Sequence, residues 1–79
     1  MKEKIQSIVR TVLERLREPD IEYYLALLDN EDIDNPTDAL ELLGETDLSA
    51  RGLFEIEEQF VNDDKLARLM DEAEEWGLD

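Results

Sequence analysis

The chain of 79 residues contains no cysteine and no histidine. Without cysteine there are no disulfide bridges or thiol nucleophiles, and without either residue there are no zinc sites of the usual kind. Histidine is also the commonest general base, so neither Ser7 nor Ser49 has a partner for a Ser-His-Asp triad. A glycine-rich phosphate-binding loop is missing as well. We therefore expect a protein that is not an enzyme and that holds no cofactor or metal.

Long apolar runs are also absent. Charged residues interrupt the apolar positions of the N-terminal stretch, which argues against a secretory signal peptide. No run approaches the roughly 20 apolar residues that a membrane-spanning helix needs. We therefore expect a cytoplasmic protein that does not associate with a membrane.

Positive charge is scarce and unevenly distributed. The chain has 8 basic and 23 acidic residues, a net charge of −15, whereas a magnitude of about 2–8 is enough to keep a small domain soluble. Residues 1–17 carry a net charge of +3, and residues 18–79 carry −18. Three explanations stay open: a binding surface for a basic partner, adaptation to high salt, or an ordinary solvated surface. Isoleucine, asparagine and glutamine are all present, which weakens the second.

The N-terminal stretch, residues 1–17, is the longest and most regular amphipathic segment. Its apolar residues recur at the spacing of one helix face. They are Ile5, Ile8, Val9, Val12, Leu13 and Leu16. We predict an all-α protein, a small bundle of four to five short helices packed around this N-terminal amphipathic helix. The whole chain, residues 1–79, is expected to form a single acidic helical domain.

Start and stop signals divide the rest of the chain into shorter helices. Pro19 ends the first helix, and Asp20 is a candidate N-cap for the second. Asn35 and Pro36 mark the start of a third helix. Asn62 is expected to cap a last helix that carries acidic residues in its first turn. The four expected helices span residues 20–29, 36–43, 50–61 and 63–76.

The loop after the second helix has the spacing of a calcium-binding EF-hand loop. Counted from Asn30, carboxylates occupy positions 3, 5, 9 and 12 of the twelve-residue loop, namely Asp32, Asp34, Asp38 and Glu41. The first position is asparagine rather than aspartate, and Asn35 replaces the glycine that the sharp turn requires. A polar connection with a helix N-cap explains the same residues without an ion, and we expect no specific metal site.

Acyl carrier proteins resemble this chain in length, acidity, helical character and lack of cysteine. They carry a phosphopantetheine on the serine of an Asp-Ser-Leu motif at a helix start. The nearest match here is Asp47-Leu48-Ser49, in which leucine and serine stand in the reverse order. The resemblance covers size and charge rather than the motif, and it implies Ser49 as the carrier residue in a minor alternative.

The function that we favour is electrostatic. Nucleic acid carries one negative charge per ~1.7 Å of duplex axis, and its binding proteins present matching rows of Lys and Arg. A helical body with carboxylates on its outer faces could occupy such a basic surface without binding nucleic acid itself. Small acidic phage proteins, which include DNA mimics and other host-takeover inhibitors, are similar in charge and size. The carboxylates expected to bind the partner are Glu55, Glu58, Asp64, Asp71, Glu72 and Glu75.

The alternative is an acidic helical adaptor or regulator that binds its partner mainly through apolar contacts. Tyr23, Tyr24 and Trp76 are the candidate apolar contacts, because tyrosine and tryptophan are enriched at interface hot spots. Packing in the core or at its rim is the competing interpretation of all three. A homodimer through residues 1–17 also stays open, because the basic residues there could offset acidic charge of a second copy.

Overall fold

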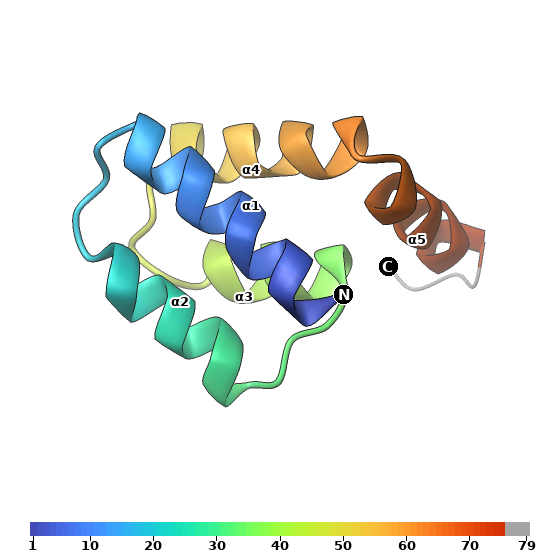
Figure 1. Cartoon of the computed structure of the whole chain (residues 1–79), viewed down its shortest axis with the longest axis horizontal. Helices are drawn as coiled ribbons and strands as arrows, with labels where there is room; N and C mark the ends of the chain where they lie inside the picture. The colour runs from blue at the N-terminus through green and yellow to red at the C-terminus, as the bar shows by residue number, and fades with distance from the viewer. Residues whose placement is uncertain (76–79) are drawn as a thin grey trace.

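The apolar stripe of the N-terminal helix lies inside the molecule. In the computed structural model, which describes the backbone of residues 1–75 and the side chains of residues 1–72, this helix is α1 (Lys2–Arg15). Ile5, Val9, Val12 and Leu13 are buried, as the spacing predicts. Figure 1 shows α1 between two other helices, α2 (Ile21–Asn30) and α4 (Ala50–Asn62), and it packs against both.

Two further helices complete the bundle. α3 (Pro36–Gly44) packs against α2 and α4, and α5 (Asp64–Glu75) packs against α3 and α4. Residues 1–75 form five helices and no strand, so the prediction of an all-α bundle is confirmed. Within the described backbone the helix boundaries differ from the predicted ones by at most two residues, and the predicted end of the last helix at residue 76 lies outside it. α4 contacts α1, α3 and α5, and it therefore joins the two ends of the chain.

One apolar core connects all five helices. Each helix contributes at least one fully buried side chain: Leu13, Leu28, Leu43, Phe60 and Leu66, from α1 to α5. Within the described part of the chain the buried set contains no polar or charged side chain. None of the helices in this part is both long and apolar enough to cross a membrane.

The predicted start signal of the third helix is used, and the fourth helix has a side-chain cap as well. The Asn35 side chain accepts a hydrogen bond from the backbone amide of Asp38 at 2.8 Å, and Pro36 is the first residue of α3. Ser49 caps α4 by accepting a hydrogen bond from the Gly52 amide at 3.1 Å. Such caps satisfy amides that have no partner within the helix.

Two other predicted caps differ from the structure. Asn62 does not cap the last helix; it is the final residue of α4, and Asp63 accepts the amide hydrogen bonds of Lys65 and Leu66 instead. The chain needs one extended residue to turn from α4 into α5, and Asp63 supplies it with ψ 118°. Asp20 precedes α2 as expected, but its φ of 61° is left-handed and its side chain makes no capping hydrogen bond.

The ends of α1 and α2 have the same geometry. After α1, the amides of Arg17 and Glu18 donate to the carbonyls of Glu14 and Leu13, which is the bond pair of a Schellman motif. α2 ends with the same pair of bonds around Asp32. The left-handed residue in such motifs is usually glycine, whereas here φ is 57° at Arg17 and 52° at Asp32. Both turns therefore carry backbone strain that a glycine would not have.

Candidate functional site

The cations of α1 point toward neighbouring elements of the same molecule. Lys2 Nζ lies 3.1 Å from a carboxylate oxygen of Asp29 and 3.1 Å from one of Asp32. The pKa of the Lys2 amine is raised above its ordinary value, mainly by the hydrogen bond to Asp29 and next by the hydrogen bond to Asp32. This contact holds the start of α1 against the end of α2.

Two arginines extend this pattern along α1. Arg10 lies 3.6 Å from a carboxylate oxygen of Glu22 on α2, and Arg15 lies 3.1 Å from one of Glu55 on α4. Glu55 was predicted to contact a partner; the structure places it in this internal ion pair, with its side chain 27% exposed. α1 is therefore linked by charge to both helices against which its apolar stripe packs.

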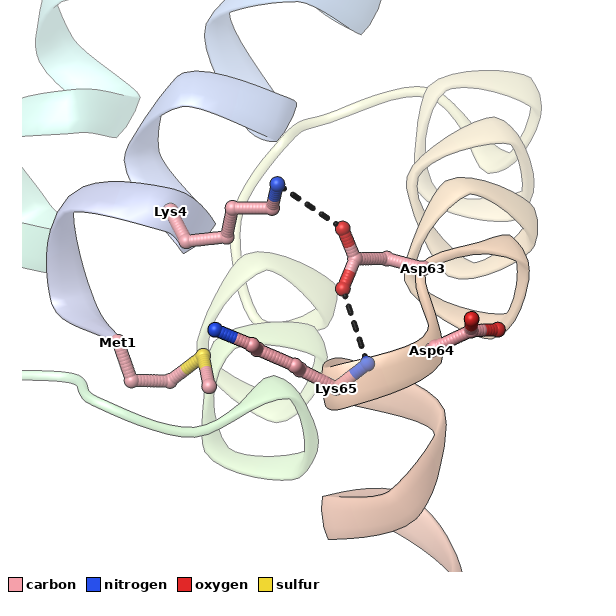
Figure 2. A pocket seen from close by; sticks show the side chains of 5 residues that line it. All are labelled: Met1, Lys4, Asp63, Asp64 and Lys65. Carbon is pink, nitrogen blue, oxygen red and sulfur yellow. Dashed lines mark hydrogen bonds and ion pairs between the residues drawn. The ribbon is translucent and has the colours of Figure 1, made fainter.

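Lys4 links α1 to the start of α5 (Figure 2). Its Nζ lies 3.1 Å from one carboxylate oxygen of Asp63, while the other oxygen accepts the amide of Lys65 at 3.2 Å. The hydrogen bond from Lys4 is the main reason that the pKa of Asp63 lies below its ordinary value. These residues line an open hollow of about 400 Å³ together with Met1 and Asp64. Because two lysines and two aspartates share it, the hollow favours neither anions nor cations, and we interpret it as a structural joint.

Other predicted partner-binding residues lie in different environments. Glu58, Asp64, Asp71 and Glu72 are exposed. Tyr23 is 57% exposed, whereas Tyr24 is 5% exposed and packs in the core, where burial is the main reason that its hydroxyl pKa is raised. The two rings meet edge to face at 5.5 Å between centroids. The Glu75 side chain and the whole of Trp76 lie outside the described residues.

Carboxylates that the sequence analysis did not assign to the partner line one face of α3. Asp38, Glu41 and Glu45 follow each other at spacings of three and four residues, so they lie on the same side of the helix. They surround a shallow depression of about 220 Å³, to which Ile33 and Leu42 contribute apolar surface. The EF-hand comparison had singled out two of the three as metal ligands. Their helical spacing was the signal that could have identified the face.

The outer face of α4 is a second surface that the sequence analysis missed. Phe54 is 59% exposed and Val61 55% exposed. They are seven residues apart, so they return to within about 20° of the same line along the helix. Glu57 and Glu58 lie between them in sequence, and both are exposed. The signal was present, because at 100° per residue Phe54 and Val61 fall on the side of the helix opposite Ile56 and Phe60.

The residues considered for a cofactor or metal have ordinary structural contacts. Ser49, the residue implied by the acyl carrier resemblance, caps α4 and donates a hydrogen bond from its hydroxyl to Glu18. In the loop with EF-hand spacing, Asp32 binds Lys2, and Asp38 accepts the side-chain amide of Asn35 at 2.8 Å. Across the described residues, no three acidic side chains are arranged so that they could hold a metal ion.

Comparison with known proteins does not place the chain in a family. No family model, curated protein or solved structure matches it.

Proposed function

We propose that this protein is a non-enzymatic acidic binding protein that docks on a basic surface of a protein partner. In this proposal the partner is a nucleic-acid-binding protein, and the acidic protein competes with nucleic acid for it. The protein thus acts as a DNA mimic, an inhibitor of the kind that phages direct against their hosts. It works in the cytoplasm and needs no cofactor.

The internal pairing of α1 is the observation that carries the proposal. Lys2, Lys4, Arg10 and Arg15 contact five carboxylates of neighbouring elements, at 3.1 to 3.6 Å. Outside these contacts the chain has 18 acidic residues and four basic ones. The basic residues of α1 are therefore paired with carboxylates of the same molecule, and the charge outside these pairs is strongly negative.

Charge density supports the same conclusion. The molecule is 35 Å long and has a net charge of −15, or roughly one negative charge for every 2–3 Å, against one per ~1.7 Å of duplex DNA. Self-repulsion at this density works against folding, which is consistent with the charge serving a partner. A protein surface that attracts DNA electrostatically would attract this surface as well.

The experiment is an affinity pull-down from a bacterial lysate with the full chain as bait. The column is washed in steps from low to high salt, and bound proteins are identified by mass spectrometry. We expect a nucleic-acid-binding protein to elute at moderate salt and to be displaced by duplex DNA, because exposed charge pairs are screened over about 10 Å at 0.1 M salt. The matched control bait is the triple variant D38N/E41Q/E45Q, which should release the same protein at lower salt.

A partner of another kind would contradict the proposal. If the retained protein does not bind nucleic acid and stays bound at high salt, the acidic charge is only a solvated surface. The protein would then be an adaptor that binds through apolar contacts, because burial of apolar surface responds little to ionic strength.

A further inference from the structure

The outer face of α4 is unlike the rest of the described surface. On the whole described surface four large apolar residues are strongly exposed, namely Met1, Tyr23, Phe54 and Val61, and the last two lie on one line along α4. Single exposed apolar residues are normal on proteins, but an aligned pair on one helix face is the arrangement that helix-in-groove recognition uses. Phe54 and Val61 are about 10.5 Å apart along the helix axis, which is two turns.

This face lies away from the apolar core. Gly52, Ile56 and Phe60 of α4 are buried on the opposite side, where α1, α3 and α5 pack. Figure 1 shows α4 along one edge of the molecule, with the other described helices on its inner side. Phe54 and Val61 are thus outside the buried core, and the more than half of each residue that stays exposed could be covered only by another molecule.

The charges beside the apolar pair indicate what would cover it. On a helix with 100° per residue, Glu57 and Glu58 lie on opposite sides of the line that joins Phe54 and Val61. Both carboxylates are exposed and lie within one turn of the apolar side chains. A covering surface with carboxylates at this place would repel Glu57 and Glu58. A covering surface with only apolar groups would remove water from these two carboxylates without pairing them. A covering surface with cations on both sides of an apolar stripe would satisfy them.

A second copy of the chain does not fit this requirement. An antiparallel pair of α4 helices could place Phe54 of one copy over Val61 of the other. The same register would bring Glu57 and Glu58 of both copies together at the centre, between two molecules that each have a charge of −15. Like charges at this distance destabilise a contact. The face is therefore suited to a partner of opposite charge.

We propose that the outer face of α4 is the docking site for a cationic amphipathic helix of the partner. The apolar side chains of that helix cover Phe54 and Val61, and its Lys or Arg residues on either side pair with Glu57 and Glu58. The inference rests on the proposed function, since it takes the partner to be basic, and it adds where and with which element the partner binds.

The test uses two synthetic peptides and the full-length protein labelled with ¹⁵N. The first peptide is a helix of leucine and lysine in heptad spacing, and the second has the same composition in an order that gives no apolar face. We expect the first peptide to shift the backbone amide signals around residues 54–61. The second should bind more weakly and shift signals over the acidic surface in general, because it offers charge without an apolar stripe.

Variants separate the two components of the face. Phe54→Ser and Val61→Ser are both expected to weaken binding of the amphipathic peptide about tenfold, as for interface anchors. The control for Phe54→Ser is Tyr23→Ser, which removes an aromatic residue of similar exposure on α2. The double variant E57Q/E58Q should weaken binding at low salt more than E14Q/E31Q, which changes the net charge by the same amount at exposed sites outside α4.

Each other outcome has a definite meaning. The amphipathic peptide could instead shift the amide signals of Asp38, Glu41 and Glu45, with an affinity that Phe54→Ser does not change. In that case this docking site is wrong and the proposed function stands. If neither cationic peptide binds at low salt, the proposed function fails as well. If the protein alone sediments as a dimer that Phe54→Ser dissociates, the occupant of the face is a second copy and the inference is overturned.

Discussion

The two phenylalanines of the chain lie on the same helix, six residues apart, and have opposite environments. Phe60 is fully buried in the apolar core, whereas Phe54 is 59% exposed. The inner face of α4 packs in the core, and the outer face lies at the surface. This comparison shows that the position of an apolar residue around the helix axis decides whether it is buried in the core. A second line of apolar residues on the same helix can stay at the surface, where another molecule can bind it.

The largest effect should separate these two phenylalanines. Phe60→Ala is expected to lower the free energy of unfolding by about 3–5 kcal/mol, because it removes a buried ring and leaves a cavity. Phe54→Ala should change it by no more than about 0.5 kcal/mol, as for other surface substitutions. Chemical denaturation followed by circular dichroism measures both. Equal destabilisation by the two variants would mean that the outer face of α4 is also part of the fold.

The start of α4 provides the next test, because its cap fixes where the helix begins. Ser49→Ala removes the acceptor for the Gly52 amide and the hydrogen bond to Glu18. We expect a loss of about 1 kcal/mol in the free energy of unfolding, the usual cost of losing an N-cap side chain. Ser49→Asp keeps a capping oxygen but faces Glu18 with a second carboxylate, so it should recover only part of the loss. A melt of Ser49→Ala identical to that of the wild type would contradict this account.

The strained end of α1 contrasts with the well-capped start of α4. Arg17 has a φ of 57°, which glycine adopts without steric cost. Arg17→Gly is expected to raise the free energy of unfolding by about 0.5–1 kcal/mol, because the relief of strain exceeds the added freedom of the unfolded chain. Arg17→Ala serves as the control, since it removes the same charge without relieving the backbone. The two variants should therefore differ, and equal stability would show that the strain is negligible.

The smallest effect concerns Asp63, which joins the end of α4 to α5 and pairs with Lys4. The pKa of its carboxyl is lower in the folded protein than the ordinary value of 3.8, chiefly because of the Lys4 hydrogen bond. The pair therefore stabilises the fold above that value, and the contribution is lost as pH falls through the lower, folded pKa. Asp63→Asn keeps a capping oxygen without the charge. Its stability should be below that of the wild type at neutral pH and converge with it in acid. A difference independent of pH would exclude the ion pair as its source.

Local patterns in the sequence were sufficient for the helices and for most of the core. Asn35 and Pro36 predict the start of α3 because a cap acts on amides a few residues away. The stripe of α1 predicts its buried residues for the same local reason, since the helix repeat fixes which side chains share a face.

The remaining features depend on contacts between elements that are distant in sequence. Tyr23 and Tyr24 are adjacent and both apolar, and only the packed structure shows that Tyr24 is buried while Tyr23 is exposed. The pairing of Arg15 with Glu55 joins residues 40 positions apart, so no local rule distinguishes Glu55 from exposed Glu58. For this reason the sequence predicted an acidic surface but not which carboxylates belong to it.

The packing of α1 against α4 also has a consequence for how the chain folds during synthesis. α1 leaves the ribosome before α4, which covers one side of its apolar stripe and supplies Glu55 to Arg15, and more than 30 residues separate the two helices. A nascent chain that has not reached α4 thus carries a basic amphipathic helix with that side uncovered. The entropy cost of closing the long loop between α1 and α4 must be met before their contact can stabilise the fold. The bundle can therefore complete its core only after α4 has emerged. Truncation within α4 should therefore release the N-terminal helix as well, and not only the residues that were removed.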